Sequence, residues 1–454
     1  MVNTRICRGW LSLWCVLAWT AGMALAQEAN EPAGHSAARW WKGNLHTHSY
    51  WSDGDQMPEM VVGWYKEHGY HFLAMSEHDR PPMGDYWKAV GDVVNPDDAW
   101  QMVLPGILTH YQKAYGPRWV ETRQHEGKTE VRLKPIGELA ALFDEPGRFV
   151  VMPSQELWTL VEVAGKPFTP GNQGTAWINL ANSYAAVPPA KSPVPREAMQ
   201  GTITNMLEYA QKNGQRVWVS LNHPNYDWGC VAEDIAAVDG LGAMEFHTAL
   251  SVCNSQGDEL HAGAERIWDI VLTLRLGALG KGLIFGMASS DSHTYEALPN
   301  MRNWGRPGRA WLMVRAERLT PESIIEAMGR GDFYGSTGVT LREVTVSPEG
   351  LSLAIEGKSG VSYTTQFIGT LEGYDARAET VVDKEGRALR TTKRYSSDVG
   401  KVLLESGDLR PSYRFTGKEL YVRAKVISSQ KHPQPSWPGQ VECAWTQPVR
   451  PGKR

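Results

Sequence analysis

The feature that most constrains the fold is a series of short apolar runs, each followed at once by histidine or carboxylate residues. Such runs, rich in β-forming residues and ending in polar groups, suit buried parallel strands. An α/β barrel collects its functional residues at the C-terminal ends of its strands, so this pattern predicts a barrel with a single site. The runs are YHFLAMS, RFVVMPSQ, RVWVSLN, GAMEF and GLIFGMASS, and they precede Glu77-His78-Asp79, Glu156, His223, His247, and Asp291 with His293, in that order.

An H-x-H pair lies upstream of these runs, in GNLHTHSYWSDG at residues 43–54. His46 and His48 alternate on an expected strand, so both imidazoles point to the same side. Two converging imidazoles chelate a divalent metal, and Asp53 follows closely as a further donor. Two unpartnered core histidines are the alternative, but burying them side by side is costly. The segment therefore predicts a metal site.

The later candidates differ in their support. Asp291 and His293 repeat the alternate spacing on the last expected strand. Glu156 suits a bridging carboxylate, with a solvated loop glutamate as its alternative. His223 stands in Asn-His-Pro, and a loop or helix-cap histidine is its alternative. His247 has only its place after a strand in its favour.

The motifs, taken in order, resemble the polymerase and histidinol phosphatase (PHP) superfamily of metal-dependent hydrolases. The matching stretches are H-x-H-S-x-x-S-D-G from His46, E-H-D from Glu77, the lone Glu156, N-H-P from Asn222 and D-x-H from Asp291. IWDIVLTLRLG at 267–277, ASSDSH and GRGDFYGSTG look most similar to the carbaryl-hydrolase-like branch. One departure is Ser76-Glu77, where the family more often has Thr-Asp. The resemblance covers residues 39 to about 345 and implies a distorted parallel (β/α)7-type barrel.

The resemblance also implies two or three divalent metals, and the donor types suit Zn, Mn or Fe. Asp53, His78, Glu156 and Asp291 are the expected catalytic members. Clustered metals would lower the pKa of a bridging water, and the resulting hydroxide would attack the substrate. The implied ligand sets are His46, His48, Glu156 and Asp291 for one metal, Glu156, His223 and His247 for a second, and Asp53, His78 and His293 for a third.

The sequence favours a phosphoesterase acting on a small-molecule substrate. Arg80, Arg302 and Arg306 follow ligand motifs and are the candidates to grip a phosphate, with solvated surface arginines as the alternative. Hydrolysis of a carboxyl ester, amide or carbamate on the same site is the second hypothesis. A non-catalytic protein whose metals hold a ligand pocket is a third, of a different class. Trp51, Tyr226 and Trp228 flank expected ligands and are candidates to line the site.

The N-terminus has the pattern of a secretory signal. Arg5 and Arg8 precede the apolar LSLWCVLAWTAGMAL, and Ala24-Leu25-Ala26 forms a small-x-small cleavage site before Gln27. The apolar run is short for a membrane span, so we expect an exported protein, periplasmic or extracellular, without a stable span after cleavage. The formal net charge of −4, without a basic tract, argues against nucleic acid as a partner.

The expected organisation is a signal peptide (1–26), a polar linker (27–38), a metallohydrolase barrel (39–345) and a C-terminal β-sandwich-like domain (346–454), where short alternating strands replace the earlier pattern. The insertion at 83–147 contains a hairpin around Glu126-Gly127 and a helix in IGELAALF. Cys230 and Cys253 lie near expected ligands, and either a disulfide or two free thiols is compatible with the sequence.

Overall fold

The computed structural model describes residues 38–90, 106–161, 174–295 and 305–452. These described residues form one compact unit. The expected signal peptide, nearly all of the expected linker, and Arg302 lie outside the described residues. Among the described residues, no helix combines the length and the apolar character needed to cross a membrane.

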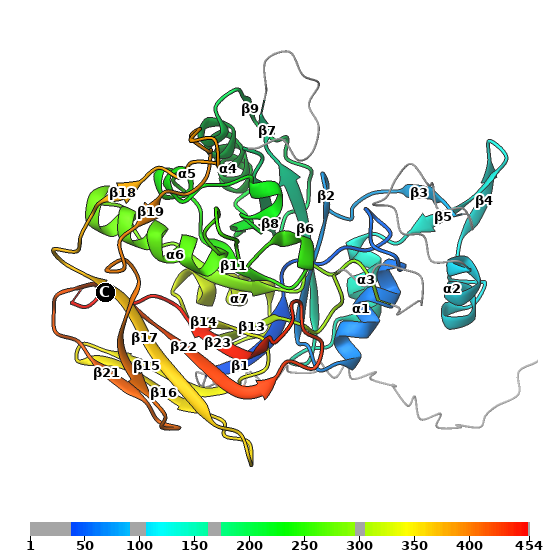
Figure 1. The fold of residues 1–454 in the computed structure, drawn as a ribbon. Helices are drawn as coiled ribbons and strands as arrows, with labels where there is room; N and C mark the ends of the chain where they lie inside the picture. The colour runs from blue at the N-terminus through cyan, green and yellow to red at the C-terminus, as the bar shows by residue number, and fades with distance from the viewer. Residues whose placement is uncertain (1–37, 91–105, 162–173, 296–304, 453–454) are drawn as a thin grey trace, which may run out of the picture. The chain divides into compact units, whose positions relative to one another are not determined.

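A large mixed sheet of 13 strands organises this unit (Figure 1). From one edge to the other, its strands are β12 (Phe285–Ser289), β11 (Ala243–Thr248), β10 (Trp218–Asn222), β8 (Trp177–Ala181), β6 (Val150–Trp158), β2 (Phe72–His78), β1 (Arg39–Asn44), β13 (Trp311–Ala316), β14 (Phe333–Ser336), β23 (Val441–Thr446), β22 (Glu419–Lys431), β17 (Tyr363–Leu371) and β20 (Lys401–Ser406).

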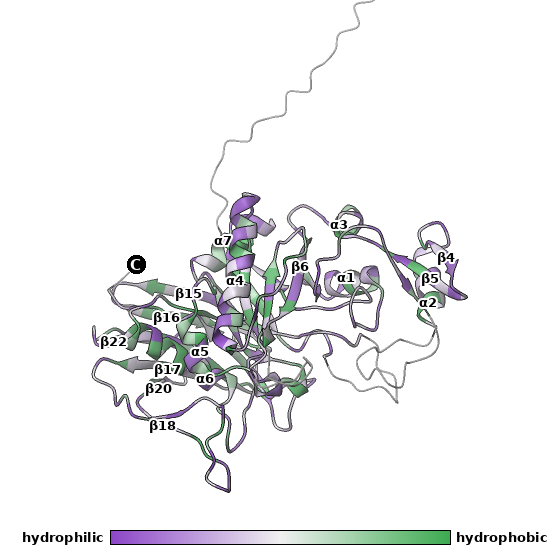
Figure 2. Cartoon of the chain, turned by 90° about the horizontal axis from the view of Figure 1, so that it is seen from above, coloured by the Kyte–Doolittle hydropathy of each residue, from purple (hydrophilic) through white to green (hydrophobic). Residues whose placement is uncertain are grey.

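The helices of the described residues lie between residues 58 and 329. They are α1 (Pro58–Glu67), α2 (Ile107–Tyr115), α3 (Ile136–Phe143), α4 (Pro195–Lys212), α5 (Ala232–Ala237), α6 (Ala264–Thr273) and α7 (Pro321–Gly329), with short turns η1 (Tyr226–Trp228), η2 (Ser251–Cys253) and η3 (Leu274–Ala278). Proline begins α4, and Gly214, at φ 59°, follows its end in the left-handed region that favours glycine. Figure 2 shows hydrophilic residues on the outer side of α4 and α7 and apolar residues on the strands beside them.

The five apolar runs form strands β2, β6, β10, β11 and β12, as the sequence predicts. In β2 every residue from Phe72 to Glu77 is buried, as expected for a strand covered on both faces. β1 pairs in parallel with β2, and β2 with β6, while β10, β11 and β12 form a second parallel group. β8 lies between the two groups and runs antiparallel to both of its neighbours.

The closed parallel barrel expected from the sequence is not observed, because the sheet remains open. β12 forms one edge, and β1 pairs on its second side with the antiparallel strand β13. That pairing occupies the hydrogen-bonding edge that β12 would need to close a barrel. Beyond the strand ends, a parallel bridge between Thr47 and Ser292 joins the two sides, and there the His48 amide donates to the Ser292 carbonyl at 2.9 Å.

The insertion after β2 forms a separate three-stranded sheet of β3 (Tyr86–Ala89), β5 (Lys128–Leu133) and β4 (Thr122–His125), which lies with α2 to the right in Figure 1. Glu126 and Gly127 form the predicted hairpin turn, both with positive φ. Two further pairs are β7 (Leu160–Val161) with β9 (Lys191–Ser192), and β18 (Ala378–Glu379) with β19 (Arg394–Tyr395).

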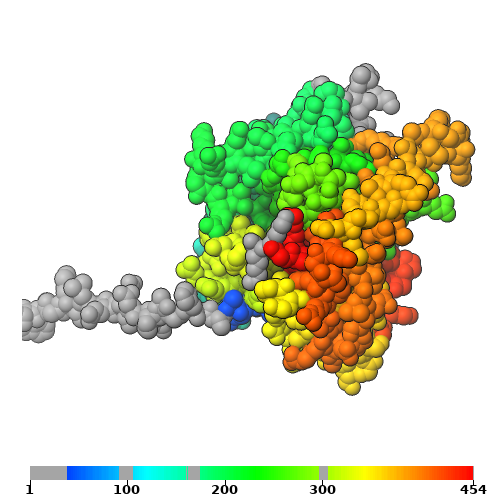
Figure 3. Space-filling model, turned by 90° about the vertical axis from the view of Figure 1, so that its left-hand side faces the viewer, coloured from blue at the N-terminus to red at the C-terminus, as the bar shows by residue number. Residues whose placement is uncertain are grey.

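The C-terminal strands form two packed layers. One is a three-stranded sheet of β15 (Leu341–Ser347), β16 (Gly350–Ile355) and β21 (Ser412–Arg414). The other is the continuation of the large sheet through β14, β23, β22 and β17, and apolar residues of both layers form one core. This part also contacts α6, where Arg423 and Asp269 form a buried ion pair at 2.7 Å. Figure 3 shows the orange C-terminal residues packed against green residues from the middle of the chain.

Candidate metal centre

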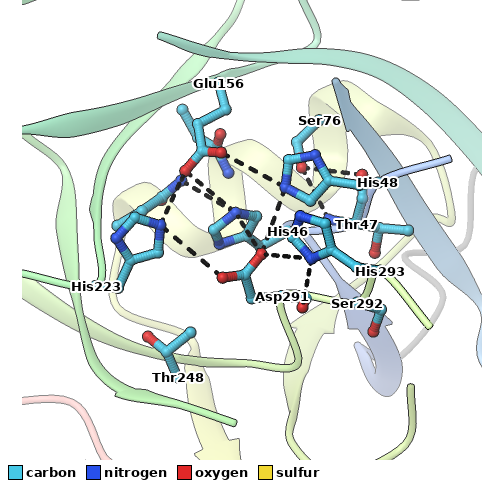
Figure 4. Close-up of polar contacts among 12 residues, drawn as sticks. His46, Thr47, His48, Ser76, Glu156, His223, Thr248, Asp291, Ser292 and His293 are labelled. Carbon is cyan, nitrogen blue, oxygen red and sulfur yellow. Dashed lines mark hydrogen bonds and ion pairs between the residues drawn. The ribbon is translucent and has the colours of Figure 1, made fainter. Parts of the chain in front are cut away.

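Eight of the nine predicted ligands come together where β1, β2, β6, β10 and β12 end. They form three overlapping groups in which one donor atom from each residue lies within 4.8 Å of the others. Figure 4 shows the side chains of His46, His48, Glu156, His223, Asp291 and His293 converging. The groups are His48, Asp53, His78 and His293; His46, His223 and Asp291; and His46, His48 and Glu156.

Glu156 lies at the centre of the cluster and uses its two oxygens on different sides. Its Oε1 is 3.2 Å from His46 Nε2 and 3.2 Å from His223 Nε2. Its Oε2 is 3.2 Å from His78 Nδ1 and 3.5 Å from His48 Nε2. Asn222 donates its amide to Oε1 at 2.6 Å, which fixes the carboxylate plane. The two oxygens of Glu156 therefore face different pairs of histidines.

Asp291 is the second carboxylate shared among the histidines. Its Oδ1 lies 3.1 Å from His46 Nε2 and 3.4 Å from His48 Nε2. Asp291 has a φ of 48°, a left-handed conformation that is strained for a non-glycine residue and common at functional sites. Its Oδ2 lies 3.9 Å from His223 Nε2 and 3.7 Å from Cys253 Sγ, so the thiol is a further soft donor beside this group.

Asp53 completes the group on the more exposed side. Its Oδ2 is 3.3 Å from His78 Nε2, and its Oδ1 is 3.3 Å from His293 Nε2. The side chains of His78, Asp53 and His293 are 25%, 18% and 14% exposed, whereas those of His46 and His48 are fully buried. The Asp53 side is therefore the more exposed side of the cluster.

Buried atoms without hydrogen bonds test whether these residues suit a metal. Among the described residues, His48 Nε2, Asp53 Oδ1, His78 Nδ1 and Asp291 Oδ1 are buried and have no hydrogen-bond partner. Such atoms are costly to leave unsatisfied, and a bound cation would satisfy these four. Imidazole nitrogens and carboxylate oxygens in this number suit Zn, Mn or Fe, so the residues fit divalent cations.

The electrostatics give the same indication. Burial alone would lower the pKa of His293, but Asp53 and Asp291 raise it to about 9. At His46, burial also acts to lower the pKa, but the charges of Asp291 and Glu156 outweigh it and hold the pKa well above its usual value. Burial, reinforced by His293 and His78, lowers the pKa of His48 to about 4. The carboxylates thus draw positive charge into the cluster, as protons when no metal is bound.

His247 lies outside the cluster, contrary to the sequence prediction. The β11–β12 register shifts between Glu245 and His247, which marks a bulge. The bulge breaks the two-residue alternation, so the rings of Phe246 and His247 both pack against Trp445, at 5.0 and 5.7 Å. His247 is buried there, and burial lowers its pKa to about 3.

Glu245, which the sequence analysis passed over, occupies the place expected for His247. Its Oε1 lies 2.9 Å from His46 Nδ1, and the whole residue is buried. Period-two alternation makes Glu245 and His247 equivalent on a regular strand. A buried glutamate in the apolar run GAMEF is the signal that could have identified it.

Aromatic side chains border the cluster. The Trp177 ring lies 5.3 Å from His78 and 5.9 Å from His223, and Trp158 stacks on it at 5.7 Å. Tyr226, one of the three predicted lining residues, lies 5.3 Å from His223. The other two differ: Trp51 donates to the Lys134 carbonyl and is buried, and Trp228 stacks on His261.

Of the predicted arginines, the described Arg80 and Arg306 make contacts elsewhere. The Arg80 guanidinium lies over the Tyr86 ring at 4.2 Å. Arg306 lines a cavity of about 380 Å³ with Lys42, Trp64 and Trp311, and none of the candidate ligands lines that cavity. Cys230 and Cys253 are both free and buried, which excludes the disulfide in this structure.

The fold and site define an α/β protein with a buried histidine–carboxylate cluster suited to divalent metals. No protein-family model matches the chain, and the curated proteins yield no match. Among solved structures, the chain is similar to a two-domain protein from Bacteroides vulgatus ATCC 8482 that contains a predicted PHP-like metal-dependent phosphoesterase. The two share 12% identity at a TM-score of 0.32, over 90% of this chain and 95% of that chain.

Proposed function

We propose that this protein is a metal-dependent hydrolase of the PHP type that acts on small phosphoesters. The observation that carries the proposal is the bridging position of Glu156, with one oxygen facing His46 and His223 and the other facing His48 and His78. Two cation positions that share one carboxylate suit the in-line displacement at phosphorus, where both the attacking and the leaving oxygen need stabilisation.

The residues would divide the work by burial. His46, His223 and Asp291 form the inner group, and His48, Asp53, His78 and His293 form the outer group that substrate meets first. Bound divalent metals would lower the pKa of a coordinated water and stabilise negative charge on the substrate. His78 and Asp53 are the most exposed members of the cluster, at 25% and 18%, and would lie nearest the incoming phosphoester.

The test is metal analysis of the purified protein combined with turnover of p-nitrophenyl phosphate and p-nitrophenyl acetate. We expect bound divalent metal and faster hydrolysis of the phosphate, with both lost in His46→Ala. His125→Ala is the matched control, since His125 is exposed on β4 and pairs with Glu130. Hydrolysis of p-nitrophenyl acetate alone would indicate a carboxyl ester hydrolase instead of a phosphoesterase. Bound metal without any turnover would favour the non-catalytic ligand-binding alternative.

We also propose that the protein is exported. The support is the series of Arg5, Arg8, the apolar run and the Ala24-x-Ala26 site. Mass spectrometry of the protein expressed in a secreting host should find a mature N-terminus at or near Gln27. An intact Met1 on the exported protein would contradict cleavage.

A further inference from the structure

Glu245 is a buried carboxylate that touches two candidate ligands through hydrogen bonds of ordinary length. Its Oε1 lies 2.9 Å from His46 Nδ1. Its Oε2 accepts from the His223 backbone amide at 2.9 Å and from the Thr248 hydroxyl at 2.8 Å. Both oxygens are thus engaged by donors on the side away from Glu156, and Glu245 belongs to none of the three ligand groups.

The contact with Glu245 orients His46. A carboxylate only accepts, so the Nδ1 that faces Glu245 carries a proton, and Nε2 is the atom that would bind a cation once its own proton is released. That Nε2 is the atom that faces Glu156 and Asp291, at 3.2 and 3.1 Å. A carboxylate behind a ligating imidazole fixes the tautomer and the ring plane and makes the ligand more basic.

His48 has a similar arrangement with one hydroxyl in between. Its Nδ1 lies 3.3 Å from Ser52 Oγ, and that hydroxyl lies 2.5 Å from Glu77 Oε2. Glu77 is buried and also accepts from the Ser49 amide and hydroxyl, at 3.1 and 2.5 Å. Glu77 therefore holds the loop that leads to Asp53 as well as the proton side of His48.

We propose that Glu245 and Glu77 are positioning residues of the candidate metal centre, each fixing one imidazole of the H-x-H pair with its Nε2 toward the cation. The inference rests on the proposed metal-dependent function and adds residues that do not themselves bind metal. Glu245 further couples the two inner ligands, because one carboxylate holds both the His46 ring and the His223 backbone.

Glutamate is specifically required at position 245 by this contact set. Three donors point at its two oxygens: His46 Nδ1–H, the His223 amide and the Thr248 hydroxyl. In Glu245→Gln the side-chain carbonyl oxygen can accept hydrogen bonds at only one of the two oxygen positions. At the other position the amide NH2 group faces a donor, so the hydrogen bond there is lost. The substitution keeps the volume of the side chain, so it perturbs the hydrogen bonds more than the packing.

The test titrates Co²⁺ into metal-free wild-type, Glu245→Gln and Glu77→Gln proteins, following the visible absorption and the affinity by competition with a chelator. We expect each variant to bind about 10- to 100-fold more weakly and with an altered absorption spectrum. The matched control is Glu419→Gln, a buried glutamate of β22 that accepts from Tyr413 at 2.7 Å and should behave as wild type. A purely structural role would shift the unfolding temperature without altering the Co²⁺ spectrum.

The outcomes separate this inference from the proposed function. Wild-type affinity and an unchanged spectrum in Glu245→Gln would overturn the positioning role while leaving the metal centre intact. Absence of Co²⁺ binding to the wild-type protein would instead refute the metal centre itself. If Glu245→Gln fails to fold, the same Co²⁺ affinity and spectrum are measured for Glu77→Gln. Unaltered Co²⁺ binding by that variant would overturn the proposal.

Discussion

His78 and Glu156 are register partners on the adjacent parallel strands β2 and β6, and their side chains meet with Nδ1 3.2 Å from Oε2. The backbone ladder therefore fixes the relative position of two candidate ligands that are far apart in the sequence. It also places Glu156 between the inner and outer groups, with each oxygen facing two histidines.

The first prediction concerns Glu156→Ala. Because both proposed cation positions lose the shared carboxylate, the metal content should fall by more than one ion per chain. Turnover should drop by at least about 100-fold, the scale of losing one preorganised charge. Inductively coupled plasma mass spectrometry and steady-state rates measure both quantities. Loss of a single metal with turnover intact would show that Glu156 serves only one position.

His247→Ala should have the opposite effect. The ring packs between Trp437 and Trp445, at 5.2 and 5.7 Å, and none of the three ligand groups includes it. We expect full metal content and a near wild-type rate, with stability lowered by about 1–3 kcal/mol because a buried ring is removed. Denaturant unfolding measures the stability change. A drop of one metal per chain would restore the ligand role that the sequence suggested.

The metal-free protein should lose stability as the pH rises from about 6.5 to about 9. Against the effect of burial, Asp53 and Asp291 raise the pKa of His293 to about 9, and Asp53 and Glu156 raise the pKa of His78. A histidine whose pKa is raised in the folded state stabilises the folded protein. This stabilisation is fully present below the unfolded pKa of about 6.5, and it is lost as the pH rises through the folded pKa. Unfolding temperatures measured between these limits should fall in the metal-free form, and metal should reduce the slope. A flat profile without metal would contradict this electrostatic account.

Trp177 should control substrate binding more than metal binding. Its ring spans the two ends of the cluster, close to His78 and His223, and it is partly exposed. Trp177→Ala should raise KM for an aryl phosphate several-fold with metal content unchanged, and Trp177→Phe should recover part of the loss. An equal KM for the alanine variant and the wild type would place the substrate elsewhere.

Much of the site could be predicted from the sequence because its residues follow a simple local rule. The apolar runs form strands, and polar residues at their ends bring His78, Glu156, His223 and Asp291 together. The bulge after Glu245 could not be predicted, because a one-residue insertion in the ladder leaves no mark in the sequence. The open sheet could not be predicted either, because it depends on the pairing of β1 with β13, which lies far along the chain.

Anomalous scattering from crystals soaked in Mn²⁺ or Zn²⁺ would test the central claim most directly. The account predicts at least two peaks beside Glu156, one toward His46 and His223 and one toward His48 and His78, with ligand distances of about 2.0–2.3 Å. Peaks confined to the protein surface, or no peak within reach of Glu156 at saturating metal, would contradict it.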